Sequence, residues 1–443
     1  MRDPCVTLAS AGALAASLAA GLAGVGQTPV SAGPVPVRIE RSGGAWRLLR
    51  AGEPYFVKGA GGSGALDRLR AAGANSVRLW DAEGSDAMLD EAARRGMSVA
   101  LGIWLGQPRQ GFRYDDAAQV ARQRERVRSL VSRYRRHPAV LVWGLGNEME
   151  GDGADPAVWR AVEDLAALVK RLDTAHPVMT VIAEVGGEKV RNLHRLCPSV
   201  DIVGINSYAG AASLPRRYVA AGGTKPYLLT EFGPPGTWEV AKTPWSAVLE
   251  PTSTEKAASY RRSYEGAVIG QPLCLGSYAF LWGNKQEGTA TWFGMLLADG
   301  EKVAAVDTMT ELWSGRPPAN RCPVIRSLRL EGPAERDPGA PVRAALEASD
   351  PDGDPLLARW ELRAEGSYGT GGDPERVPPE VRGAVMRGDA RGVEARLPAE
   401  PGAFRLFVTV RDGKGGAATA NVPLLARAGG AGQGHATPRA KPP

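Results

Sequence analysis

Two glutamates stand where apolar segments of the chain end. Glu148 follows the segment 139–146 (AVLVWGLG), and Glu231 ends the segment 226–231 (PYLLTE). Short apolar segments rich in β-branched residues are typical of buried strands. Cleavage of a glycosidic bond requires a pair of carboxyl groups, one protonated and one ionised. The two glutamates are therefore candidate catalytic residues, provided that the fold brings their strand ends together.

The segments around these glutamates belong to a longer alternation of strand-like and helix-like patterns. Strands that alternate with helices pair in parallel, and strands without polar alternation are buried on both faces. Eight such units over roughly 260 residues fit a (β/α)8 TIM barrel, an α/β fold. An open doubly wound sheet is the alternative, but Gly59, Gly61 and Gly62 lack the spacing of its nucleotide-binding turn. The predicted strands are 54–60, 75–80, 97–103, 139–146, 178–184, 201–206, 226–231 and 274–281, and the predicted helices include 64–72, 84–95, 156–172, 255–268 and 303–314.

Polar residues gather where the predicted strands end. The active site of a TIM barrel lies at the C-terminal ends of its strands. The residues found there are Arg78, Asp81, Asn147, Glu148, Glu184, Asn206, Tyr208, Glu231, Trp282, Asn284 and Lys285.

Four stretches resemble clan A glycoside hydrolases, above all families 2 and 5. They are VWGLGNE (142–148), GINSY (204–208), LLTEFGPPG (228–236) and SYAFLWG (277–283). The resemblance covers about 55–316 and implies a retaining glycosidase. It implies that the Asn-Glu pair after strand four supplies the acid/base, Glu148, and that the strand-seven glutamate, Glu231, is the nucleophile.

The resemblance also implies roles for the neighbouring residues. Asn147 is expected to bond the sugar 2-hydroxyl, and Tyr208 is expected to hold the nucleophile. Arg78 is expected to keep that nucleophile ionised, the alternative being an ion-pair residue that lines the barrel. Trp282 is expected to form the apolar floor under the reacting sugar. Once Glu231 is ionised, its charge should raise the pKa of Glu148.

Aromatic residues near the predicted mouth are candidate sugar subsites, because indoles stack on the C–H faces of sugar rings. Trp104 and Trp238 are the residues selected for this role, with about half of the tryptophans expected to be structural. The loop 232–251 is long for a simple connection and is expected to form a wall or lid over the site. Glu184 is expected to be a hydrogen-bonded rim residue, and Asp81 either a sugar contact or a helix cap.

The first 32 residues differ from the rest. Residues 6–25 carry no charge, and Val30-Ser31-Ala32 offers small residues for cleavage, so 1–32 is interpreted as a signal peptide, with a membrane anchor or an alanine-rich tail as alternatives. This interpretation places the protein outside the cell or at the cell envelope. A β-hairpin around Ser42-Gly43-Gly44 is expected to precede the barrel, within a domain of 33–318.

After the barrel the pattern becomes all-β. Residues 323–427 predict a small β-sandwich that resembles immunoglobulin-like or PKD-type modules, with a disordered tail at 428–443. Its default role is a spacer or attachment module. Asp350, Asp352 and Asp354 are interpreted as an acidic turn, with calcium binding as the alternative.

Composition excludes several other classes. The formal charge of +6 is modest for 443 residues, and its one local concentration, Arg122–Arg136, has the spacing of an amphipathic helix rather than a nucleic-acid site. The four cysteines lack metal-ligand spacing, so no metal or cofactor is expected, and Cys274 is interpreted as a core residue.

The sequence therefore predicts a retaining glycoside hydrolase that cleaves a β-linked oligo- or polysaccharide. A transglycosylase that remodels cell-wall glucan would use the same residues. A carbohydrate-binding protein without catalytic activity is the alternative from another class.

Overall fold

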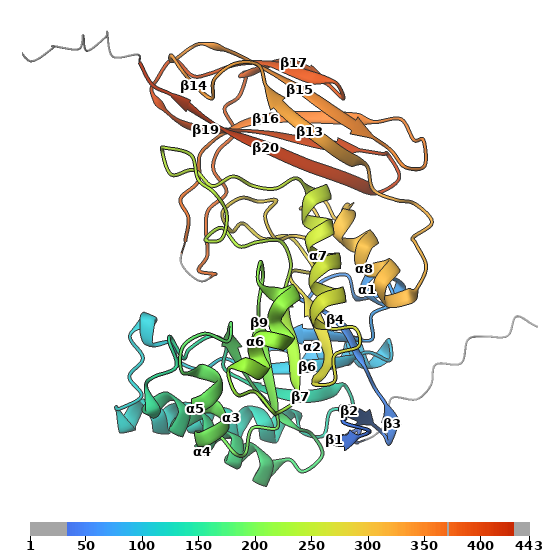
Figure 1. Cartoon of the computed structure of the whole chain (residues 1–443), viewed down its shortest axis with the longest axis vertical. Coiled ribbons are helices and arrows are strands. Elements are labelled where there is room, and N and C mark those ends of the chain that lie inside the picture. The colour runs from blue at the N-terminus through green and yellow to red at the C-terminus, as the bar shows by residue number, and fades with distance from the viewer. Residues whose placement is uncertain (1–32, 370–371, 429–443) are drawn as a thin grey trace, which may run out of the picture.

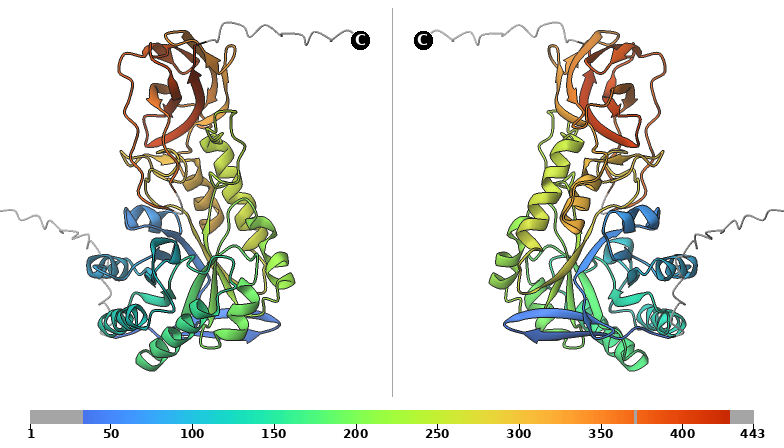
Figure 2. Two further views of the ribbon diagram at one scale, coloured as in Figure 1. Left: turned by 90° about the vertical axis from the view of Figure 1, so that its left-hand side faces the viewer. Right: turned by 90° about the vertical axis from the view of Figure 1, so that its right-hand side faces the viewer.

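The computed structural model describes residues 33–369 and 372–428 as a barrel surrounded by helices and a β-sandwich stacked on one end of it (Figures 1 and 2). The predicted signal peptide and nearly all of the predicted tail lie outside the described residues. Among the described residues, none of the helices combines the length and the apolar character needed to cross a membrane.

Eight parallel strands close into a barrel, as the alternating pattern predicts. The last strand pairs with the first, with Gly276 opposite Val57, so the open doubly wound sheet is excluded. In barrel order the strands are β4 (Val57–Gly61), β5 (Ser76–Leu79), β6 (Ser98–Ile103), β7 (Val140–Leu145), β8 (Val178–Ala183), β9 (Ile202–Asn206), β10 (Tyr227–Phe232) and β11 (Cys274–Ala279).

Helices cover the outside of the barrel. The predicted basic amphipathic helix is α3, where Asp116 caps the N-terminus by accepting from the amides of Ala118 and Gln119, while Val127 and Val131 are fully buried. The buried face explains why the arginines of α3 lie in solvent. The helices are α1 (Leu66–Ala71), α2 (Asp86–Arg94), α3 (Ala117–Tyr134), α4 (Pro156–Leu172), α5 (Lys189–Leu196), α6 (Leu214–Ala220), α7 (Ser253–Ala267) and α8 (Ala304–Ser314).

The predicted hairpin closes the end of the barrel away from the sandwich (Figure 2). Strand β1 (Val37–Ser42) pairs with β2 (Ala45–Arg50), and β3 (Glu53–Pro54) adds to β2. Gly43 and Gly44 have φ of +58° and +84°, which suits a two-residue hairpin turn that only glycine adopts without strain. The hairpin packs Val37 and Leu48 against the barrel interior and so shuts the end opposite the candidate site.

The C-terminal part is a β-sandwich of two antiparallel sheets around one apolar core, as predicted. The short strand β12, which precedes α8 of the barrel, pairs with β20, so the two parts share a sheet. One sheet holds β13 (Val324–Leu330), β15 (Pro341–Ser349), β18 (Gly392–Arg396) and β17 (Val385–Asp389), and the other holds β12 (Lys302–Val303), β14 (Glu335–Arg336), β16 (Leu357–Ala364), β19 (Gly402–Arg411) and β20 (Gly416–Ala426).

The acidic residues of the sandwich form a turn. One carboxylate oxygen of Asp350 accepts from the backbone amides of Asp352 and Asp354 at 2.8 and 3.1 Å. Asp352 pairs with Arg321, and Asp354 pairs with Lys414. In 33–369 and 372–428 these aspartates belong to no group of acidic, histidine or cysteine side chains arranged to hold a metal ion. These contacts fit the interpretation of the three aspartates as an acidic turn.

Closure of the barrel depends on a glycine in its last strand. Gly276 has φ of +124°, and a Cβ there would lie 2.1 Å from the Val57 carbonyl oxygen. We predict that Gly276→Ala lowers the free energy of unfolding by more than about 2 kcal/mol, through backbone strain and the lost β11–β4 pairing. Chemical denaturation measures this. Gly64→Ala, in open space, is the control and should change stability by less than about 0.5 kcal/mol. Equal stability of the two variants would contradict the prediction.

Candidate active site

The carboxylate of Glu231 lies at the C-terminal mouth of the barrel, held by three hydrogen-bond donors. Its Oε1 accepts from Arg78 Nη1 at 2.9 Å and from Trp80 Nε1 at 2.8 Å. Its Oε2 accepts from the Tyr208 hydroxyl at 2.7 Å. Glu231 is only 6% exposed, and both of its carboxylate oxygens are bonded, one of them by a guanidinium.

Arg78 connects the nucleophile candidate to the strand-four side of the barrel. Its Nη1 also donates to the Thr230 carbonyl at 2.8 Å, and its Nη2 donates to Asn147 Oδ1 at 2.7 Å. The guanidinium stacks on the Trp80 ring, with 5.0 Å to the ring centroid. Arg78 is 3% exposed. It pairs with Glu231 inside the barrel and also bonds Asn147, which lines the cavity.

Glycine at position 61 lets Trp80 reach Glu231. A Cβ on Gly61 would come within 2.5 Å of the Trp80 ring. Residue 61 ends β4, next to β5, which leads into Trp80. The small residue therefore makes room for an indole that donates to the carboxylate.

Glu148 lies beyond the end of β7, in a constrained backbone conformation. Its φ is +52°, a left-handed value that costs a non-glycine residue about 1–3 kcal/mol. Its amide donates to the Val181 carbonyl of β8 at 3.0 Å, which holds the turn in place. Its Oε1 accepts from Asn206 Nδ2 at 2.6 Å. The same Nδ2 donates to Asn147 Oδ1 at 3.2 Å, so a chain of hydrogen bonds runs from Glu148 to Arg78 and Glu231.

The two carboxyl groups have different environments. The pKa of Glu148 is raised to about 7, mainly by burial and then by the negative charge of Glu231, while the Asn206 hydrogen bond opposes the rise. Glu231 has three donors, one of them a cation, whereas Glu148 has one neutral donor. These surroundings favour a proton on Glu148 near neutral pH.

Both glutamates line one cavity of about 730 Å³. Of the predicted site residues, Asn147, Tyr208, Trp104 and Trp238 line it with them, and Arg78 lies behind Glu231. Trp238 is 60% exposed and stands edge-on to Tyr208, with centroids 5.6 Å apart. The remaining lining residues are Trp80, Ala183, Glu184, Asn206, Thr237, Glu239, Lys242, Val248, Phe280, Leu281, Lys285, Glu287, Tyr368, Gly369 and Gly372.

The loop after β10 forms a wall of this cavity, as its length predicts. Thr237, Trp238, Glu239, Lys242 and Val248 all line the cavity. These residues come from the loop 232–251, and Trp238 of this loop is the most exposed aromatic residue that lines the cavity.

The prediction for Trp282 is wrong. Trp282 is 1% exposed and donates from Nε1 to the Ala65 carbonyl at 3.3 Å, so its ring lies in the core between the barrel and the helices. The Trp282 amide bonds the Gly61 carbonyl at 2.7 Å, which turns the side chain away from the cavity. Phe280 takes the expected place, lining the cavity edge-on to Tyr208 at 6.0 Å.

Two other predicted site residues, Glu184 and Asp81, form ion pairs with arginines. Glu184 lines the cavity and pairs with Arg217 and Ser207. Asp81 pairs with Arg126 at 2.7 Å, outside the cavity lining, so the sugar-contact alternative is not supported. Trp292 is 1% exposed and belongs to the core, as expected for part of the tryptophans.

Sequence reasoning missed four contributions. Asn206 stood among the candidates at the strand ends, but not as a partner of Glu148. Trp80 ends the predicted strand 75–80 and was not expected to bond Glu231. Phe280 sits two residues before the tryptophan that was chosen instead. Tyr368 comes from the sandwich, and nothing in the local sequence signals a place in the cavity.

Residues 75–236 match the model of the TIM barrel domain of glycosyl hydrolases family 2. The match supports a glycosidase barrel. Of the two families that the motifs resemble, family 2 is the one whose model matches this part of the chain. No curated protein matches the chain.

Several solved structures share the fold. A family 2 β-galacturonidase of Eisenbergiella tayi is 16% identical, with a TM-score of 0.51, over 64% of this chain and 54% of that one. A β-glucuronidase of Bacteroides uniformis is 13% identical, with a TM-score of 0.50, over 88% and 48%. A β-glucuronidase of Ruminococcus gnavus is 17% identical, with a TM-score of 0.50, over 63% and 53%. This chain thus spans about half the length of the structures it matches.

The electrostatic coupling of the two glutamates can be measured directly. We predict that Glu231→Gln lowers the pKa of Glu148, because the like charge is removed while burial of Glu148 keeps part of the shift. Titration of ¹³C-labelled glutamate carboxyl groups by NMR reports this. Glu184→Gln, which changes a cavity carboxylate paired with Arg217, is the control and should leave the Glu148 titration in place. An unchanged Glu148 pKa in Glu231→Gln would refute the coupling.

Proposed function

We propose that this protein is a retaining glycoside hydrolase that cleaves a β-linked glycan by double displacement. The observation that carries the proposal is that two glutamates in one cavity have different hydrogen-bond and charge surroundings. Glu231 accepts three hydrogen bonds, one from a guanidinium, and Glu148 has a pKa raised to about 7 by burial and by its neighbour. A nucleophile must be ionised and an acid must be protonated, and the contacts of the two glutamates support this division of roles.

In the first step, Glu231 attacks the anomeric carbon and forms a glycosyl ester. The bond from that carbon to the glycosidic oxygen breaks, and Glu148 gives its proton to the departing oxygen. In the second step, Glu148 takes a proton from water as the water oxygen attacks the anomeric carbon. The ester bond then breaks and Glu231 leaves as a carboxylate, so the proton count is restored.

The pKa of Glu148 changes in the direction that each step needs. Esterification neutralises Glu231, which removes a charge that raises the pKa of Glu148. Glu148 then loses its proton more readily and is able to act as the base toward water. After release of the sugar, the charge of Glu231 returns and favours protonation of Glu148 again.

Neighbouring residues are suited to bind the reacting sugar. Asn147 Oδ1 already accepts from Arg78 and Asn206, which leaves its Nδ2 to donate to a sugar hydroxyl. Phe280, Trp104 and Trp238 offer apolar surface for the C–H faces of sugar rings. These residues supply orientation, and the glutamates supply the chemistry.

Product analysis tests the mechanism. We expect turnover of at least one 4-nitrophenyl β-glycoside in a panel of glucoside, galactoside, mannoside and glucuronide, with the β-anomer formed first by ¹H NMR. Glu231→Ala should lower kcat by at least about 10⁴-fold. Added azide should then yield the α-glycosyl azide, because azide attacks from the face that the carboxylate leaves open.

Glu148→Ala is the matched variant, and with azide it should yield the β-glycosyl azide after a normal first step. Formation of the α-anomer first by the wild-type protein would refute retention. Added acceptor oligosaccharides in the same assay reveal any transfer to sugar instead of water.

The placement of Phe280 rather than Trp282 in the cavity leads to a separate prediction. Phe280→Ala should raise KM for the aryl glycoside about tenfold, because the apolar surface beside the reacting sugar is lost. Trp282→Phe should lower the melting temperature and leave KM unchanged, because Trp282 is buried away from the cavity. Steady-state kinetics and thermal denaturation separate the two. If Trp282→Phe raised KM more than Phe280→Ala does, Trp282 rather than Phe280 would be the residue under the reacting sugar.

A further inference from the structure

A segment of the sandwich reaches the candidate active site. It connects β16 to β17 and leaves the sandwich toward the barrel (Figure 1). We call its described residues 365–369 and 372–380 the wall segment. Tyr368, Gly369 and Gly372 of this segment line the same cavity as Glu148 and Glu231. The sandwich is therefore in contact with the catalytic cavity, which a simple spacer would not be.

The far part of the wall segment is bonded to two barrel loops. Asp373 pairs with Arg109 at 3.1 Å and accepts from Gln110 at 3.2 Å, both in the loop after β6. Lys285, in the loop after β11, donates to the Gly372 carbonyl at 3.3 Å. Strands β4 and β5 lie between β11 and β6 in the barrel, so the wall segment spans the mouth on that side.

Glu375 fixes the middle of the wall segment. Its Oε2 accepts from the amide of Gly288 in the barrel at 2.8 Å. Its Oε1 accepts from the amide of Gly369 at 2.7 Å, within the wall segment itself. A single carboxylate thus ties the residues beside the cavity to the loop after β11.

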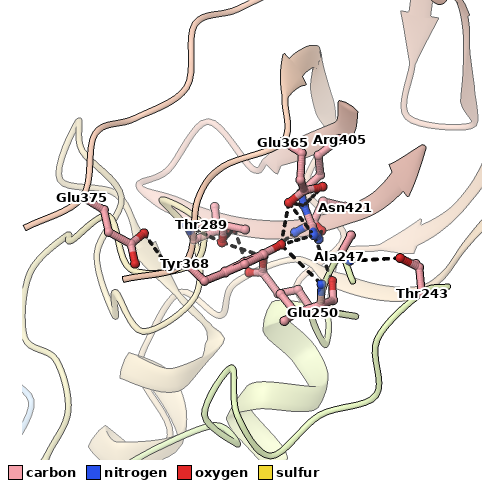
Figure 3. Close-up of polar contacts among 12 residues, drawn as sticks. Thr243, Ala247, Glu250, Thr289, Glu365, Tyr368, Glu375, Arg405 and Asn421 are labelled. Carbon is pink, nitrogen blue, oxygen red and sulfur yellow. Dashed lines mark hydrogen bonds and ion pairs between the residues drawn. The ribbon is translucent and has the colours of Figure 1, made fainter. Parts of the chain in front are cut away.

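A buried network holds the near part (Figure 3). Arg405 of β19 is 1% exposed and donates from Nη2 to Glu365 at 2.9 Å, to Tyr368 at 3.0 Å and to the Val248 carbonyl at 2.9 Å. Its Nη1 donates to Asn421 at 2.6 Å, and Asn421 donates to Glu250 of the barrel at 2.6 Å.

The charges of this network are paired across the boundary between the two parts. Glu250 also accepts from Lys256 and from Thr289, and its side chain is 1% exposed. Buried charges are costly unless every one is bonded, so the network favours a single arrangement of Arg405, Glu365 and the wall segment. The wall segment is therefore a fixed part of the cavity.

The hydroxyl of Tyr368 has no capacity left for a ligand. It donates to Glu365 at 2.6 Å and accepts from the Val248 amide at 3.3 Å and from Arg405 at 3.0 Å. A hydroxyl offers one donor and two acceptor positions, and all three are used. The half-buried ring, which packs against the aromatic cluster around Tyr208 and Phe280, is what Tyr368 presents to the cavity.

Tyr368 and Glu231 have different bonding partners in the cavity. The barrel neighbours of Tyr368 include Val248 and Gly288, which belong to the loops after β10 and β11. The carboxylate of Glu231 is bonded by Arg78, Trp80 and Tyr208 instead. This difference favours a sugar next to the reacting one as the partner of the Tyr368 ring.

We propose that the β-sandwich supplies one wall of the substrate cleft and that Tyr368 is a specificity-determining residue that contacts a sugar beyond the reacting one. This inference rests on the proposed glycosidase function. It makes the substrate an oligosaccharide or longer glycan, recognised in part by the sandwich.

The test compares a short and a long substrate. The short one is the best 4-nitrophenyl β-glycoside of the panel, and the long ones are β-1,4-linked gluco-, galacto- and manno-tetrasaccharides. Tyr368→Ala should lower kcat/KM for the tetrasaccharide about tenfold, through KM, and leave the aryl glycoside unchanged. Tyr368→Phe keeps the ring and should resemble the wild type on both. Tyr368→Leu keeps apolar packing without the aromatic face and should resemble Tyr368→Ala, which separates ring stacking from loss of folding.

Tyr55→Ala is the matched control. Tyr55 precedes β4, at the opposite end of the barrel, and bonds the Asn75 carbonyl at 2.7 Å. It should change thermal stability without changing the ratio of the two kcat/KM values. If Tyr368→Ala leaves that ratio unchanged, or if Tyr368→Phe is as impaired as Tyr368→Ala, the proposed sugar contact is wrong while the glycosidase proposal stands.

Calorimetric titration of the tetrasaccharides into the wild-type and Tyr368→Ala proteins separates the two proposals. If neither substrate is turned over, the glycosidase proposal fails. Binding that weakens in Tyr368→Ala would then still support the wall, and binding that is absent or independent of Tyr368 would overturn it.

Discussion

The set of contacts around the Glu231 carboxylate is the constraint on which the site depends. Arg78, Trp80 and Tyr208 donate to this carboxylate inside the barrel, and Arg78 is itself nearly inaccessible to solvent. Arg78 lies in β5, Trp80 follows β5 and Tyr208 follows β9, whereas Glu231 lies in β10. Closure of the barrel therefore brings charge and counter-charge together. Loss of one partner would leave the other buried and unpaired, which costs several kcal/mol.

The different behaviour of Glu148 follows from the same arrangement. It shares the cavity but takes its hydrogen bond from neutral Asn206, and the charge of Glu231 acts on it. Two identical side chains thus have different electrostatic surroundings, and those of Glu148 raise its pKa. The backbone of Glu148 is left-handed, and such strain is typical of functional positions. Here it accompanies a side chain that lines the same cavity as Glu231.

The sequence was sufficient to predict the barrel and the meeting of Glu148 and Glu231 at its mouth, because apolar runs identify buried strands and parallel strands place their ends together. It was not sufficient at the end of β11. Phe280 and Trp282 are two residues apart and would share a face in a regular strand, but the chain leaves β11 at Ala279. The amide of Trp282 then bonds Gly61 and its ring enters the helix layer. The path of the chain after β11 depends on contacts with neighbouring strands, and the local sequence pattern does not predict it.

The sandwich is the other feature that local sequence leaves open. The stretch Gly366-Ser367-Tyr368-Gly369 has the composition of a linker, and its place is set by partners outside it, Arg405 at Tyr368 and Glu375 at Gly369. Because the buried polar groups around Arg405 find their partners across the boundary, separating the two parts would leave charges unpaired on both sides. Docking of the sandwich and shaping of the cavity are therefore one event. A chain that kept the barrel alone would keep both glutamates but lose the surface that limits which glycan reaches them.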